Sequence, residues 1–414
     1  MIWGGCTNSC WIADEATVAM TSAVLPSQHS HRDNTVTRTE SEELSEMAQG
    51  KRAMLMVGTR KGLWVGRSDE SRSDWEWDSP AFNMEEVYSC MVDTRRSTPR
   101  LLVGASSSWI GPQVGRSDDL GRTWEANPDG GIRFPEDAGA SLERIWQLQP
   151  GVGDEEVWAG TEPGAVFRSG DGGETFSLVR GLWDHPQRPE WGAGFGGQAF
   201  HTVLPHPTDP QSVTAAISTG GVYRTADGGD SWEPRNKGIR ADFLPEDQRY
   251  PEFGQCVHKV ARHASVPERL YAQNHGGVYR SDDEGATWQS IADGLPSDFG
   301  FPMVVHPHDP DTIHVFPLAG AEGRFPPEGK ARVWRSQDAG ESWEPLGGSG
   351  PGGLPDDFFI GVIRDAMCAD NHADAGLYFG TRNGSVWASF DSGESWQEVA
   401  RNLPDVMVVR AALV

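Results

Sequence analysis

The stretch YRSDDEGATW (residues 279–288) is typical of a tight polar turn between two β-strands. Asp283 can accept hydrogen bonds from backbone N–H groups of the turn, as an Asx turn does. Gly285 can adopt a positive φ angle, which a residue with a Cβ resists. Trp288 begins the second strand and offers a large surface to bury. Each of these residues therefore has a structural task, and the stretch is interpreted as a joint between strands.

The same sequence motif recurs along the chain at intervals of 52 to 56 residues. The aspartates equivalent to Asp283 in the six copies are Asp119, Asp171, Asp227, Asp283, Asp338 and Asp391. A degenerate seventh copy, RSDESRSDW, ends at Trp75 and has Glu70 in place of the Asp and Arg72 in place of the Gly. Because the consensus of a repeat usually reports packing, we interpret the six aspartates as structural residues and not as six active sites.

Each copy follows two short apolar runs joined by a Gly turn, as in RLYAQNHGGVYRS (residues 269–281), and a further run lies upstream. One repeat is therefore four strands, A to D, with the quoted motif as the C–D turn. The motif resembles the Asp box, or BNR repeat, of sialidases, xyloglucanases, the sortilin ectodomain and photosystem assembly factors. The resemblance covers residues 53–414 and implies a β-propeller. It implies no single activity, because those relatives include enzymes, receptors and assembly factors.

Counting repeats predicts an all-β fold, a single seven-bladed β-propeller of four-stranded blades over residues 51–414. The A strands are expected near residues 87–93, 143–149, 199–205, 256–262, 301–306, 359–364 and 405–412. The first blade has no A strand before it, and the C-terminal run has no B, C or D strand after it. The two chain ends therefore complete one blade, and this closure removes the exposed sheet edges. Residues 27–50 are polar and poor in apolar side chains, so we expect residues 1–50 to be a disordered tail or, up to residue 46, a segment preceding a true start at Met47.

The composition excludes several classes of function. Lys and Arg number 35 against 60 Asp and Glu, so the net charge of −25 disfavours nucleic acids and anionic membrane surfaces as partners. Five irregularly spaced cysteines indicate no disulfide framework. No apolar run reaches transmembrane length, and the first 30 residues make a poor secretory signal. We therefore expect a cytoplasmic monomer.

The longest connections predict where a ligand binds. Residues 177–198 and 238–255 join D to A strands, and residues 104–115 and 317–332 join B to C strands. In a propeller these connections lie on the face opposite the C–D turns, so we expect a binding site there, at the mouth of the central channel. The candidate ligand-binding residues near this mouth are Arg144, Trp183, His185, Arg188, Trp191, His201, His258, Asn274 and His275.

Each of these candidates also has a plainer interpretation. His201 and His258 can be repeat positions satisfied by backbone carbonyls, and Trp183 and Trp191 can pack the long insert down instead of stacking on a sugar. A zinc ion or another divalent metal held by His185, His201 and His258 is an alternative, although no metal-spacing motif supports it. Otherwise no cofactor is expected.

A glycosidase would require a pair of carboxylates, for which the candidates are Asp184, Glu190 and Glu246. Sialidases carry a Phe/Tyr-Arg-Ile-Pro start, an arginine triad, a tyrosine nucleophile and acidic partners. The nearest stretch here is IRFP (residues 132–135), in the wrong order and position, so we expect no exo-sialidase activity.

Three functions remain open. The first is binding, with or without glycosidase-like hydrolysis, of a small polar ligand such as a saccharide at the channel mouth. The second is a non-enzymatic scaffold that holds a protein partner on the loop rim. The third is a metal-dependent enzyme that uses channel-mouth histidines.

Overall fold

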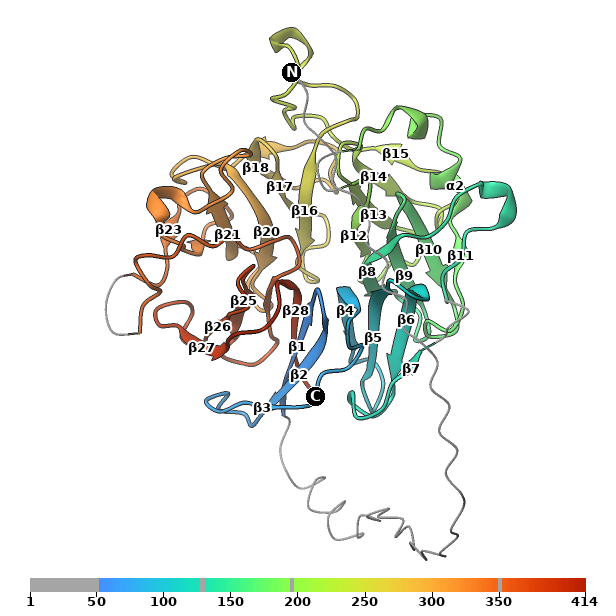
Figure 1. The fold of residues 1–414 in the computed structure, drawn as a ribbon. Helices are drawn as coiled ribbons and strands as arrows, with labels where there is room; N and C mark the ends of the chain where they lie inside the picture. The colour runs from blue at the N-terminus through green and yellow to red at the C-terminus, as the bar shows by residue number, and fades with distance from the viewer. Residues whose placement is uncertain (1–51, 127–130, 194–196, 349–351) are drawn as a thin grey trace, which may run out of the picture. The chain divides into compact units, whose positions relative to one another are not determined.

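The computed structural model describes residues 52–126, 131–193, 197–348 and 352–414. The tail expected over residues 1–50 lies outside the described residues. The described chain forms seven antiparallel sheets of four strands each, placed around a common centre (Figure 1). The predicted all-β fold with seven four-stranded blades is therefore confirmed. In the part of the chain that the structure describes, no helix has the length and apolar character needed to cross a membrane.

The blades are numbered in chain order, and each is given from its inner strand A to its outer strand D. Blade 1 is β28 (Val406–Leu413), β1 (Ala53–Thr59), β2 (Gly62–Ser68) and β3 (Glu76–Trp77), and blade 2 is β4 (Glu86–Asp93), β5 (Arg100–Ser107), β6 (Gly111–Ser117) and β7 (Glu125–Ala126). Blade 3 is β8 (Arg144–Pro150), β9 (Val157–Glu162), β10 (Ala165–Ser169) and β11 (Ser177–Leu178). Blade 4 is β12 (Phe200–Pro205), β13 (Val213–Ile217), β14 (Gly221–Thr225) and β15 (Glu233–Pro234). Blade 5 is β16 (Val257–Arg262), β17 (Leu270–Asn274), β18 (Gly277–Ser281) and β19 (Gln289–Ser290). Blade 6 is β20 (Phe299–Val305), β21 (Ile313–Leu318), β22 (Trp334–Ser336) and β23 (Glu344–Pro345). Blade 7 is β24 (Met367–Ala369), β25 (Leu377–Gly380), β26 (Val386–Ser389) and β27 (Gln397–Ala400).

Blade 1 closes the ring with strands from both ends of the propeller. β28 pairs antiparallel with β1, from Ala53 opposite Leu413 to Gly58 opposite Val408. Every residue of β1 is buried. A Cβ added at Gly58 would lie 2.5 Å from a methyl carbon of Val408, so the Val408 side chain occupies the space that a larger residue would need here. The closure predicted from the two unpaired chain ends is therefore the one observed.

The inner strand of blade 7 differs from the prediction. A strand was expected over residues 359–364, but β24 begins at Met367 and has three residues. Residues 359–363 form no strand, and the backbone of Asp365 instead makes a parallel bridge to Val408 of β28, with the Val409 N–H donating to the Asp365 carbonyl at 2.8 Å. The physical reason is the Asp365 side chain, which is buried against Lys259 of β16 and Arg410 of β28 and draws this segment away from its own blade.

The six repeated motifs form equivalent C–D turns. In blade 4, Asp227 accepts hydrogen bonds from the Thr225 hydroxyl at 2.7 Å, from the Ser231 backbone N–H at 2.9 Å and from the Ser231 hydroxyl at 2.5 Å. Gly229, at a φ of 106°, donates its N–H to the Thr225 oxygen. The same three contacts to the aspartate recur at the other five copies. These bonds hold the turn, as the sequence analysis proposed for this residue pattern.

The degenerate copy in blade 1 uses other contacts. Arg72 occupies the glycine position with a φ of 57°, a left-handed conformation that an L-residue adopts at a cost. Its guanidinium is buried and donates to Asp370 at 2.9 Å and to the Asp374 carbonyl at 2.8 Å. Asp370 directly follows β24, so this ion pair ties blade 1 to blade 7 at the point where the ring closes.

Candidate functional site

A cavity of about 880 Å³ lies at one end of the central channel. Its walls come from the first residues of A strands, from the last residues of B strands or those directly after them, and from the connections themselves, as at Ala193, Phe243 and Arg324. These strand ends are the ones that the D–A and B–C connections join, so the cavity opens on the face opposite the C–D turns. None of the six repeat aspartates lines it.

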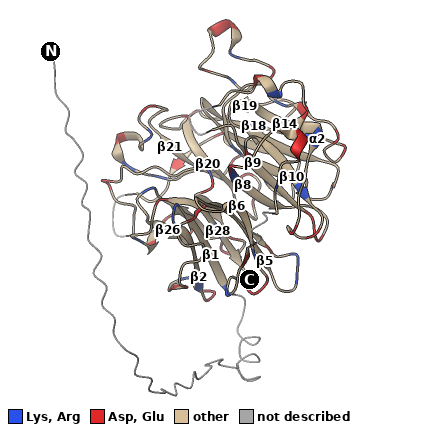
Figure 2. Cartoon of the chain, turned by 45° about the vertical axis from the view of Figure 1, so that its right-hand side comes forward, with Lys and Arg blue, Asp and Glu red and all other residues tan. Residues whose placement is uncertain are grey.

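Arginines dominate the charge of this cavity. The five arginines that line it are Arg60, Arg144, Arg324, Arg364 and Arg382. Two carboxylates, Glu162 and Asp365, line it as well. The walls are therefore positively charged in a chain whose net charge is −25, and acidic residues are spread over the turns and loops around the blades (Figure 2). Such a local reversal of sign concentrates anions at the cavity.

Most of the cavity arginines already have carboxylate partners. Arg60 contacts Glu86 at 2.7 Å and Asp405 at 3.1 Å, and Arg382 contacts Asp405 at 2.6 Å. Arg144 donates to Glu162 at 2.9 Å. These ion pairs hold the guanidinium groups in position and partly neutralise their charge, so they attract a ligand less strongly.

Arg364 differs from them. Its Nη2 lies 3.3 Å from the Ser218 hydroxyl, and its guanidinium carbon lies 5.7 Å from the Trp146 ring and 5.5 Å from the Phe301 ring. Among the described residues no carboxylate lies within ion-pair distance of it, and its buried Nε has no hydrogen-bond partner. Burial lowers the pKa of Arg364 from its ordinary value, which reflects the cost of holding this charge in the cavity. An anionic ligand would offset that cost.

The two cavity carboxylates are both engaged. Glu162 accepts hydrogen bonds from Arg144 and from the Trp146 indole, each at 2.9 Å. Asp365 accepts from Lys259 at 2.8 Å and from Arg410. Burial alone would raise the pKa of Asp365, but the Lys259 and Arg410 charges outweigh it, and the pKa lies below its ordinary value. Asp365 is therefore an ionised structural anion and a poor proton donor.

Tyr88 of β4 also reaches the cavity. Its hydroxyl donates to Glu86 at 2.9 Å, and the Arg144 guanidinium carbon lies 5.5 Å from its ring. Burial, followed by the hydrogen bond to Glu86, raises the pKa of Tyr88 above its ordinary value. The phenol is therefore neutral at pH 7 and has a carboxylate placed to accept its proton.

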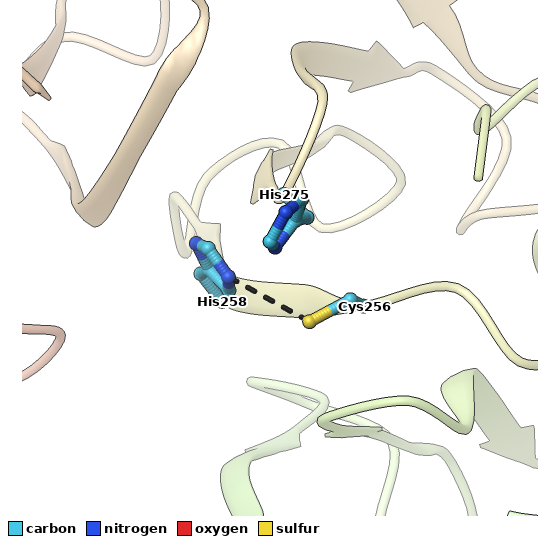
Figure 3. A group of neighbouring side chains, drawn as sticks. All are labelled: Cys256, His258 and His275. Carbon is cyan, nitrogen blue, oxygen red and sulfur yellow. Dashed lines mark hydrogen bonds between the residues drawn. The ribbon is translucent and has the colours of Figure 1, made fainter. Parts of the chain in front are cut away.

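Cys256, His258 and His275 form a cluster of metal-binding types on the blade 5 wall (Figure 3). The Cys256 sulfur lies 3.7 Å from the His258 Nε2. Burial raises the pKa of the Cys256 thiol and lowers the pKa of His275; it also holds the pKa of His258 well below its ordinary value. Both imidazoles are therefore neutral at pH 7, the form in which histidine binds metals.

The structure brings three of the predicted ligand-binding residues to the cavity, namely Arg144, His258 and His275. His201 does not line it. It is fully buried, with its Nε2 at 2.9 Å from the Val257 carbonyl and its Nδ1 at 3.1 Å from the Thr202 hydroxyl, which matches the plainer interpretation of a satisfied repeat position. Asn274 is buried too and donates to the Arg240 carbonyl at 3.1 Å.

The insert over residues 180–191 packs on the blades and does not line the cavity. Trp191 is buried among apolar residues of blades 3 and 4, and its indole donates to the Tyr223 hydroxyl at 2.7 Å. Trp183, at the end of α2 (Arg180–Trp183), is buried in the blade 3 cluster. The Arg188 guanidinium carbon lies 3.3 Å from the centre of the Trp183 ring, and His185 packs beside Trp191.

The predicted catalytic carboxylates also lie elsewhere. Asp184, Glu190 and Glu246 are exposed, and none of them lines the cavity. Within the described residues, the side chains of Cys256, His258 and His275 lie close enough to share a metal ion, whereas His185, His201 and His258 form no such group.

Two cavity arginines that the sequence analysis missed, Arg60 and Arg382, could have been predicted from the ends of the B strands. Arg60 and Arg382 follow the B strands of blades 1 and 7 in the matching stretches VGTR (57–60) and FGTR (379–382). Aligning the ends of the B strands, in the same way as the A strands, predicts that both arginines reach the mouth. Arg364 was missed because its segment was assigned to a strand.

Comparison with known proteins indicates a distant relationship to xyloglucanases. The sequence matches no family model. It is 25% identical over 276 residues to an oligoxyloglucan-reducing end-specific xyloglucanase of Emericella nidulans, a match that covers 58% of this chain and 30% of that protein. It is 29% identical over 143 residues to the xyloglucanase Xgh74A of Acetivibrio thermocellus, covering 31% of this chain and 16% of that protein. The chain thus spans less than a third of the length of these relatives.

Among solved structures, the chain resembles YCF48 from Cyanidioschyzon merolae with a TM-score of 0.50 and 14% identity, over 77% of this chain and 86% of that one. At this identity the likeness concerns the fold alone.

Proposed function

We propose that the chain binds a small saccharide that carries a carboxylate group, in the cavity at the mouth of the central channel. The observation that carries the proposal is Arg364, a cavity guanidinium with no carboxylate partner among the described residues. A carboxylate is the group that a guanidinium binds best, through two parallel charge-assisted hydrogen bonds.

Two further observations support a saccharide as the body of this ligand. The volume of about 880 Å³ falls in the range of small-molecule sites, roughly 300–1,000 Å³. Trp146, Phe301 and Tyr88 place aromatic rings beside the arginines, where a sugar ring can pack. The xyloglucanases that the chain resembles act on a polysaccharide, which favours this class over other organic acids.

The test compares acidic and neutral sugars of the same shape by isothermal titration calorimetry. D-glucuronate and D-galacturonate are titrated against D-glucose and D-galactose, with wild type and with Arg364→Gln. We expect the uronates to bind more tightly than the neutral sugars, and Arg364→Gln to weaken them by roughly 10- to 150-fold, the loss of one charge-assisted contact.

The matched control is Arg188→Gln, which removes an arginine that stacks on Trp183 away from the cavity. It is expected to leave the affinity unchanged. Equal affinity for the uronates and the neutral sugars, or an Arg364→Gln protein that binds uronates as wild type does, contradicts the proposal.

A second candidate function, hydrolysis of an acidic glycoside, is favoured by the Tyr88–Glu86 pair. Glu86 is placed to take the phenolic proton, which is how an adjacent base activates a weak nucleophile. The cavity lining offers no free carboxylate to protonate a leaving group, because Glu162 and Asp365 are both engaged. An aryl glycoside, whose phenolate leaves without a proton, is therefore the substrate to test. Release of 4-methylumbelliferone from its glucuronide, lost in Tyr88→Phe, supports this candidate, and no release contradicts it.

A further inference from the structure

The cluster of Cys256, His258 and His275 is built into two paired strands. Cys256 directly precedes β16, and His258 is the second residue of that strand, at an irregularity in its pairing with β17. His275 directly follows β17, and its N–H donates to the Cys256 carbonyl at 2.9 Å, which sets it opposite Cys256 on the neighbouring strand. The side chains of all three converge on one point (Figure 3), and all three line the cavity.

The orientation of His258 is fixed by a second contact. Its Nδ1 lies 2.6 Å from the Gly300 carbonyl of β20, so Nδ1 carries the proton and the lone pair is on Nε2. That Nε2 is the atom that faces the Cys256 sulfur. A metal-binding histidine almost always donates its other ring N–H to a carbonyl or a carboxylate in this way. The blade 6 backbone therefore holds His258 in the state in which it can bind a metal.

The separation of Cys256 and His258 fits one tetrahedral ion. Two ligands of zinc at the tetrahedral angle, a sulfur at about 2.3 Å and a nitrogen at about 2.0 Å, lie about 3.5 Å apart. The observed separation between Cys256 Sγ and His258 Nε2 is 3.7 Å. Ligand atoms of all three residues lie within 4.8 Å of one another.

We propose that Cys256, His258 and His275 bind one Zn²⁺ ion on the wall of the cavity. One thiolate and two imidazoles select a borderline or soft metal and disfavour Mg²⁺ and Ca²⁺, which take oxygen ligands. Three protein ligands leave the fourth position of a tetrahedral site open, and this position faces the cavity. Arg364 supplies none of its ligands, so the site is distinct from the anion binding proposed above, although the Arg364 charge acts on Cys256 and His258 from nearby.

The test uses the full chain with Cys6→Ser and Cys10→Ser, which removes the other pair of closely spaced cysteines. The protein is stripped with a chelator and titrated with Zn²⁺ by calorimetry, and with Co²⁺ by absorption spectroscopy. We expect one Zn²⁺ per chain, and a Co²⁺ form with a thiolate-to-cobalt charge-transfer band and the intense visible bands of tetrahedral cobalt. Cys256→Ser is expected to remove the charge-transfer band.

The variant His275→Gln distinguishes a metal-binding role of the cluster from a purely structural one. His275 is only partly buried, so its replacement is expected to leave the fold intact. We expect both Cys256→Ser and His275→Gln to weaken Zn²⁺ by at least about tenfold, whereas His206→Ala, in an A–B turn on the opposite face, has no effect. Absence of stoichiometric Zn²⁺ binding in folded protein overturns the proposal. So does Zn²⁺ binding that Cys256→Ser and His275→Gln leave unchanged.

Discussion

Replacing Asp365 by asparagine is expected to destabilise the propeller strongly. Asp365 follows the Arg364 segment of blade 7 and contacts Lys259 of blade 5 and Arg410 of the closing strand β28. The side chains are 5%, 10% and 21% exposed, respectively. An asparagine at this position would keep the shape of the side chain and lose its charge, so two buried cations would remain without their anion.

The magnitude follows from that burial. Breaking a buried ion pair by removing one partner costs about 3–5 kcal/mol, because the remaining charge stays desolvated. Asp405 provides a matched control, since it also bridges two cations, Arg60 and Arg382, but these are 43% and 49% exposed. Water can solvate them after Asp405→Asn, so that change is expected to cost less than about 1 kcal/mol.

The assay is urea-induced unfolding followed by the fluorescence of the 17 tryptophans, at pH 7. Adding Lys259→Met to Asp365→Asn is expected to recover part of the lost free energy, because it removes one of the two unpaired charges. The pKa of Asp365 is depressed in the folded protein. Its contribution is therefore fully present above the unfolded pKa, near pH 4, and disappears as the pH falls through the folded value. An Asp365→Asn protein that is no less stable than Asp405→Asn refutes the reasoning.

Three other predictions concern the scaffold. Asp227→Ala removes three turn hydrogen bonds on the face away from the cavity, so it is expected to lower the free energy of unfolding by about 1–2 kcal/mol and to leave uronate affinity unchanged; a folded protein that has lost binding contradicts this. A chain that lacks residues 406–414 loses β28 and exposes the edge of β1, so it is expected to aggregate or to melt far below wild type in a thermal-unfolding scan; a monomer with normal melting contradicts the closure. Burial lowers the pKa of His314 to about 3, so between pH 7 and pH 5 only the unfolded chain binds a proton at this histidine. The free energy of unfolding is therefore expected to fall by about 2 kcal/mol over this pH range. Urea titrations of His314→Leu at pH 7 and pH 5 are expected to lack this part of the loss.

The repeat made most of the fold predictable. The position of Asp227 and its five equivalents set the period, and the unpaired apolar runs at the two chain ends required that β28 join β1. These features are local in the sequence, since each motif carries its own turn bonds. The inner strand of blade 7 was predicted wrongly because residues 359–364 have strand-like composition. Their path is set by the partners of Asp365, which lie 106 and 45 residues away in sequence and belong to other blades.

The candidate site was less predictable for the same reason. Arg144 and His258 emerged from aligning the A strands, and these residues do reach the cavity. Trp191 and His201 share the same neighbourhood in sequence, but apolar packing between blades buries them. Which polar residue faces the channel and which faces a neighbouring blade depends on strand register at the ring centre, and the period of the repeat does not report it.

The central claim is that a saccharide carboxylate binds at Arg364 in the mouth of the channel, and a crystal structure with D-glucuronate tests it most directly. We predict ligand density inside the cavity, with the carboxylate within hydrogen-bond distance of the Arg364 guanidinium and the sugar ring against Trp146 or Phe301. Density for the ligand at the C–D turn face, or an empty cavity in crystals grown at saturating glucuronate, would contradict the account.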